Sequence, residues 1–96
     1  MHIQYVTITA KPGREEAVGA ALTALAEATR AHEPRTRTYE LYATPEPGVF
    51  GIWEVYEDKE AHEAHRTSAH FQAAFPALME DLAGRPDVVV LTPKSV

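Results

Sequence analysis

The stretch WEVYEDKEAHEAHRTSAHF, from Trp53 to Phe71, decides how this chain folds. It opens with the end of a half-buried strand that carries Trp53, Glu54 and Tyr56. Asp58 follows at the position of a helix N-cap, so a helix begins there without a linker. This helical part carries three of the chain's five histidines: His62, His65 and His70. Titratable imidazoles are therefore expected beside a strand that bears aromatic and carboxylate side chains.

Outside this stretch, proline and glycine divide the chain into further elements. The expected strands cover residues 2–10, 37–43, 49–57 and 87–92, and the expected helices cover 14–31 and the region from 59 to 83. The second and third strands are joined by the turn Thr44-Pro45-Glu46-Pro47-Gly48, which makes them an antiparallel hairpin. The order β-α-β-β-α-β predicts an α+β fold of the ferredoxin-like type, with a four-stranded antiparallel sheet and its helices on one face.

Local signals set the expected helix ends. Apolar residues recur every three or four positions between Arg14 and Ala31, which predicts an amphipathic helix. Glu33-Pro34 ends it, because a residue before proline is pushed out of the α region. In the second helical region, we expect a bend near Thr67-Ser68, with Ser68 capping a second segment and Gly84 closing it.

The residue pattern of the third strand predicts that two copies of the chain associate. Phe50, Ile52, Glu54 and Tyr56 point to one face, whereas Val49, Gly51, Trp53 and Val55 point to the other. Both faces are mostly apolar, and the last strand has the same character. Two helices cover one face only, so the second face is expected to pack against another copy of the chain. A face-to-face homodimer is the simplest arrangement, since a twofold interface buries the same patch on both copies.

Composition excludes several classes of protein. Ninety-six residues suit one domain, expected to span residues 1–96. Nine Lys+Arg against fourteen Asp+Glu give a net charge of −5, which argues against nucleic-acid binding. The absence of cysteine excludes disulfides, thiolate metal sites and a cysteine nucleophile. No basic-then-apolar leader and no apolar run of about 18 residues is present, so we expect no membrane partner and a cytoplasmic location.

Motifs spread over the whole chain resemble the antibiotic biosynthesis monooxygenase family. They are Lys11-Pro12-Gly13, Glu33-Pro34, Tyr39, Phe50-x-x-x-Glu54-x-Tyr56, Ala61, His65, Ser68 and His70-Phe71. Two positions depart from the family pattern. Arg35 stands where glycine usually follows Glu-Pro, which is expected to alter a loop near the first helix. Tyr56 stands where tryptophan is common, which bears on the pocket shape and the choice of substrate.

The resemblance implies a dimeric α+β barrel with a pocket between the sheet and the helices of each subunit. Family enzymes oxidise phenols, hydroquinones or polyketide anthrones with molecular oxygen and without metal or flavin, so no cofactor is expected. A deprotonated phenol can itself donate an electron to oxygen. The protein then has to supply a base of near-neutral pKa, donors that hold the anion and a dry cavity.

The resemblance and the residue types together select the candidate site. His65 is the expected base or anion stabiliser, because histidine titrates near neutral pH. Glu54 and Tyr56 are expected to assist catalysis. The expected substrate-binding residues are His70, Tyr39, Phe71 and Phe75. Each has a structural alternative: helix–strand packing for His65, closing the bend for His70, a paired buried carboxylate for Glu54, and core packing for the aromatic residues.

Metal ligation and other reactions are alternatives. His62 and His65 form an H-x-x-H pair on one helical face, but a third protein ligand has no assured position, so no metal site is expected and His62 is interpreted as a surface residue.

Haem-degrading relatives use an asparagine on the first strand and a histidine late in the second helix, whereas this chain offers Thr7, Thr9 and Phe75. The rival functions are isomerisation of a small carbonyl compound and a non-catalytic, metabolite-binding or stress-related dimer.

Overall fold

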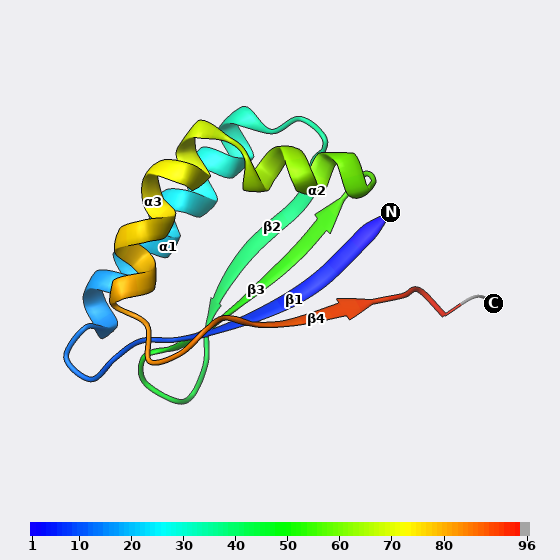
Figure 1. Ribbon diagram of the computed structural model, residues 1–96. Coiled ribbons are helices and arrows are strands. Elements are labelled where there is room, and N and C mark those ends of the chain that lie inside the picture. Colours follow the sequence, from blue (N-terminus) through cyan, green and yellow to red (C-terminus); the bar gives the residue numbers. More distant parts are fainter. Residues whose placement is uncertain (95–96) are drawn as a thin grey trace.

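The computed structural model describes residues 1–94 (Figure 1). The elements follow the order β1 (His2–Thr9), α1 (Glu15–His32), β2 (Thr36–Ala43), β3 (Val49–Tyr56), α2 (Lys59–Arg66), α3 (Ala69–Glu80) and β4 (Asp87–Leu91). This order confirms the expected α+β, ferredoxin-like fold. The predicted strand and helix ends differ from the observed ones by at most one residue, except at the end of α3.

The four strands form one antiparallel sheet in the order β2-β3-β1-β4. Figure 1 shows all three helices on the same side of this sheet, with β4 lying away from them. The strand β3 is central and pairs with both β1 and β2, so it is held from both sides. A side chain on the helix-facing side of β3 therefore lies in the middle of the protein.

Two polar side chains start the helices α2 and α3. The Asp58 carboxylate accepts a hydrogen bond of 2.8 Å from the Ala61 N–H, and the Ser68 hydroxyl accepts one of 3.2 Å from the Phe71 N–H. Both caps satisfy N–H groups that have no partner inside the helix. The predicted bend at Thr67-Ser68 is confirmed, and it divides the second helical region into α2 and α3.

The predicted closure of the last helix by Gly84 is wrong. The helix α3 ends at Glu80, and Asp81 is its C-cap. The reason is tertiary, because the following residues bond to the end of β1. The N–H of Lys11 donates to the Asp81 carbonyl at 2.8 Å, and the N–H of Ala83 donates to the Thr9 carbonyl at 2.8 Å. These contacts take the chain out of the helix before it reaches Gly84.

The alternation predicted for β3 is confirmed. Ile52, Glu54 and Tyr56 are buried beneath the helices, whereas Trp53 is half-buried on the other face. There its ring lies 6.4 Å from that of Tyr5. The core under the helices consists of aliphatic residues and Tyr39: Val6, Ile8, Ala10, Val18, Leu22, Ala26, Tyr39, Ile52, Leu78 and Leu82.

The strand β4 leaves apolar side chains exposed on both of its faces. Val88 and Val90 point to the side of the helices, and Val89 and Leu91 point to the opposite side, with exposed fractions between 36% and 60%. Among the described residues, no helix is both long enough and apolar enough to cross a membrane.

Candidate functional site

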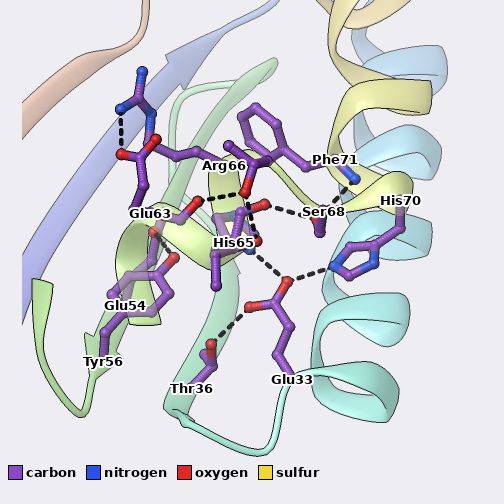
Figure 2. Close-up of polar contacts among 12 residues, drawn as sticks. Glu33, Thr36, Glu54, Tyr56, Glu63, His65, Arg66, Ser68, His70 and Phe71 are labelled. Atoms are coloured by element: carbon purple, nitrogen blue, oxygen red, sulfur yellow. Dashed lines mark hydrogen bonds and ion pairs between the residues drawn. The ribbon is translucent and has the colours of Figure 1, made fainter. Parts of the chain in front are cut away.

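Glu33, His65 and His70 meet where all three helices come together (Figure 2). Glu33 is the C-cap of α1, His65 lies in the last turn of α2, and His70 lies in the first turn of α3. The Glu33 Oε2 atom is 2.8 Å from His65 Nδ1 and 2.5 Å from His70 Nε2. The bend between α2 and α3 thus directs two imidazoles at one carboxylate oxygen.

The second oxygen of Glu33 is also held. Its Oε1 atom accepts a hydrogen bond of 2.7 Å from the Thr36 hydroxyl at the start of β2. Burial by itself raises the pKa of Glu33, but the hydrogen bonds from Thr36 and His65 outweigh this effect, so the pKa lies below its ordinary value. Glu33 is therefore a carboxylate at neutral pH.

His65 is the buried imidazole of the cluster, with 3% of its surface exposed. Burial lowers the pKa of His65, and the Glu33 carboxylate opposes this effect only in part. The imidazole is therefore neutral at pH 7. Because a carboxylate accepts hydrogen bonds, the network assigns the proton to Nδ1 and leaves Nε2 as an acceptor. Among residues 1–94, no side chain or backbone group forms a hydrogen bond with this Nε2.

Aromatic rings surround His65. Its ring centroid lies 5.1 Å from that of Tyr39, 5.6 Å from that of Tyr56 and 5.0 Å from that of Phe71. Phe71 in turn stacks on Phe75 at 5.0 Å. All the aromatic residues selected from the sequence are thus connected to His65, and they leave its surroundings largely apolar.

Glu54 lies on β3 and does not contact His65. Its Oε1 atom accepts hydrogen bonds from Gln4 Nε2 at 3.0 Å and from the Tyr56 hydroxyl at 2.5 Å. Burial is the largest cause of a pKa near 7, which these two hydrogen bonds only partly offset. The carboxylate that holds the imidazole is Glu33, which was interpreted from the sequence as a helix end and part of a family motif but not as a site residue.

His62 is not the surface residue that was expected. It is half-buried, its ring stacks on that of His2 at 4.3 Å and it lies 5.0 Å from that of Tyr56. Burial, followed by the neighbouring His2, lowers the pKa of His62 to about 4. The H-x-x-H pair does not share a ligand position, because His65 faces Glu33 and His62 faces His2.

Two cavities lie next to the cluster. One of about 460 Å³ lies between α1 and α3, is lined largely by alanine and includes His70. Another of about 510 Å³ lies at the edge strand β2 and includes Tyr39 and Thr36. Neither is lined by His65, Glu54 or Tyr56. Neither cavity therefore reaches the Nε2 atom of His65.

The family model for the antibiotic biosynthesis monooxygenase matches residues 1–77, which include every residue of the cluster. The chain belongs to the antibiotic biosynthesis monooxygenase family. No curated protein matches it significantly.

Solved structures share the antibiotic biosynthesis monooxygenase fold over nearly the whole chain. A structure described as an antibiotic biosynthesis monooxygenase is 25% identical, with a TM-score of 0.92, and the match covers 99% of this chain and 100% of that one. Rv0793 from Mycobacterium tuberculosis is 27% identical, with a TM-score of 0.89 and coverage of 99% and 96%. PA3566 from Pseudomonas aeruginosa is 26% identical, with a TM-score of 0.90 and coverage of 98% and 94%.

Proposed function

We propose that this protein is a cofactor-independent monooxygenase that oxidises a small quinol or polycyclic phenol with molecular oxygen. One observation carries the proposal. The buried His65 is held by Glu33 through Nδ1, lies among aromatic rings, and has its Nε2 atom available to accept a proton. Family membership supports an oxidation of this kind.

The reaction begins when Nε2 of His65 removes the phenolic proton. The phenolate donates one electron to oxygen, and the two radicals combine at a ring carbon that bears hydrogen. The imidazolium returns its proton to the distal oxygen and gives a hydroperoxide, which loses water to form the quinone. One oxygen atom enters the product and the other leaves as water, so no external reductant is required.

The neighbouring side chains have separate roles in this proposal. Burial raises the pKa of the Tyr39 hydroxyl above its ordinary value of 10, so it stays protonated and can donate a hydrogen bond to the phenolate. Glu54 and Tyr56 hold each other and would form one wall of the pocket that opens next to His65 when the substrate enters. His70, Phe71 and Phe75 form the opposite wall. Because Phe71 and Phe75 are only half-buried, we expect this stacked pair to move when the substrate enters.

The working unit is a homodimer formed by the sheet face opposite the helices. On this face Tyr5 and Trp53 lie side by side, and Val89 and Leu91 are exposed nearby on β4. A second copy would cover these apolar side chains and give the sheet two apolar neighbours, the helices on one face and the partner on the other.

Oxygen uptake with a panel of hydroquinones and polycyclic phenols tests the reaction. We expect uptake that depends on the protein, and labelled oxygen gas should place one labelled atom in the quinone. Conversion of a carbonyl substrate without oxygen would support the isomerase instead. Tight binding of these phenols without turnover would support the non-catalytic module.

A further inference from the structure

We infer that Glu33, His65 and His70 form a binding site for a divalent transition-metal ion of the zinc type. The three potential ligand atoms, Glu33 Oε2, His65 Nδ1 and His70 Nε2, lie within 4.8 Å of one another. Two imidazoles and one carboxylate are a common set of zinc ligands in proteins. This inference goes beyond the proposed reaction, which uses no metal.

The charge of the cluster favours a cation. Only 10% of the Glu33 side-chain surface is exposed, and its ion-pair partners among residues 1–94 are His65 and His70, with no lysine or arginine. Both partners are imidazoles, which carry a positive charge only when protonated, so the carboxylate lacks a permanent positive partner. The hydrogen bonds to Glu33 keep it ionised, and a divalent ion held by all three side chains would add the missing positive charge.

The geometry needs only a small adjustment to bind an ion. Ligand atoms about 2.0–2.1 Å from a tetrahedral zinc ion lie about 3.3 Å from one another. The present separations of 2.8 Å and 2.5 Å are those of hydrogen bonds. The two imidazole nitrogens lie within 4.8 Å of each other and have to come closer, so side-chain movements of about 1 Å suffice.

The surroundings of the three ligands also suit an ion. The Thr36 hydroxyl already orients the other oxygen of Glu33, as an outer hydrogen bond does in metal sites. Access is available on the side of His70, which is 17% exposed and borders the cavity of about 460 Å³ between α1 and α3. With three protein ligands, the fourth position is left for water.

Metal binding and the proposed oxidation would exclude each other. A metal ion on Nδ1 of His65 displaces the proton from this atom, and the neutral imidazole then carries its hydrogen on Nε2. The metal-bound protein would therefore lack the proton acceptor at Nε2. Zinc would thus inhibit the reaction and would not assist it.

Calorimetric titration of zinc chloride into chelator-treated protein tests the site without substrate. We expect saturable binding of about one ion per chain, weakened at least about tenfold in Glu33→Gln and in His70→Gln. The control is His62→Gln, which removes the other half of the H-x-x-H pair and should bind as the wild type does. Absence of saturable binding, or unchanged binding in the two ligand variants, would overturn the site. Loss of binding in His62→Gln would also overturn it, because the ion would then be bound by the H-x-x-H pair His62 and His65.

A measurement on the wild type guards against misfolded variants. In NMR spectra of the histidine rings, zinc should shift the nitrogen signals of His65 Nδ1 and His70 Nε2 and leave those of His2, His32 and His62 in place. Shifts confined to the latter group would overturn the site. The outcome is independent of turnover, so failure of the oxidation and failure of the metal site can be told apart.

Discussion

Glu33 and His65, which are 32 positions apart in the chain, are joined by a hydrogen bond of 2.8 Å between Oε2 and Nδ1. This contact fixes which imidazole nitrogen carries the proton, because a carboxylate can only accept. The bend at Ser68 and the end of α1 before Pro34 bring the two residues together. The proposed proton transfer to Nε2 of His65 depends on this pair.

Replacing Glu33 by glutamine should impair the reaction by freeing the His65 ring. An amide can present either its oxygen or its NH₂ group to Nδ1, so the imidazole would no longer be held in one tautomer. We expect kcat to fall about 10–100-fold with little change in KM, since Glu33 positions the base and does not contact the substrate. Nitrogen NMR should show a proton on Nδ1 in the wild type and a mixture of tautomers in the variant.

The matched control for Glu33→Gln is Glu63→Gln, which alters an exposed glutamate of α2 that pairs with Arg66. It should leave kcat and the His65 tautomer unchanged. Equal losses in both variants, or a single unchanged tautomer in Glu33→Gln, would contradict the positioning role.

Glu54 should make folding stability fall as the pH rises. Its pKa is raised from 4.5 to about 7 in the folded protein, chiefly by burial. Below pH 4.5 both the folded and the unfolded states hold the proton, and above pH 7 both have lost it. Between these values the folded state binds more protons, so rising pH removes up to about 3 kcal/mol of stability.

Urea denaturation at pH 5 and pH 8 measures this effect. Both experiments use the same protein concentration, because the stability of the proposed dimer depends on it. The stability lost between the two pH values should be smaller in Glu54→Gln than in the wild type, because glutamine does not titrate. An equal loss in both proteins would show that Glu54 does not keep its proton in the folded state.

The contact between Tyr5 and Gly51 should make the glycine hard to replace. A Cβ atom on Gly51 would lie 1.8 Å from the Tyr5 hydroxyl oxygen. Gly51→Ala should therefore reduce the free energy of unfolding by about 1–3 kcal/mol. Gly84→Ala is the control, since a Cβ atom there meets no atom within 4 Å. Urea denaturation of the two variants should separate them, and equal stabilities would show that Tyr5 turns away without cost.

The proposed homodimer should depend on one face of β4. Val89 lies opposite Tyr5 on the open face of the sheet, whereas Val90 lies opposite Gln4 on the side of the helices. Val89→Glu places a charge in the proposed interface and should shift the mass measured by light scattering towards the monomer. Val90→Glu introduces the same charge on the other face and should leave a dimer. A wild type that is monomeric at micromolar concentration would contradict the interface.

The sequence patterns predicted the strands and helices well, because strand alternation and helix caps depend on residues that are close together in the sequence. The alternation along β3 placed Trp53 and Glu54 on opposite faces, and the caps Asp58 and Ser68 were recognised from their types and positions. The helix end at Gly84 was predicted wrongly, since backbone bonds from Lys11 and Ala83 end the helix earlier, and these bonds join segments that are distant in sequence.

The candidate site was harder to predict from the sequence. His65 and His70 were selected by residue type and family resemblance, but Glu33 was interpreted as a helix end and part of a family motif, without a role in the site. A carboxylate directly before Pro34 was the available signal. Its pairing with histidines 32 and 37 positions away depends on how α1 packs beside α2 and α3, which no local pattern encodes.

Oxygen uptake by the wild type and by His65→Ala, with the same phenolic substrate, tests the central claim most directly. The expected result is protein-dependent uptake in the wild type and a rate at least about 100-fold lower in the variant, as for loss of a general base. His62→Ala, a neighbouring histidine that faces His2, should keep most of the rate. Uptake that continues undiminished in His65→Ala would contradict the account.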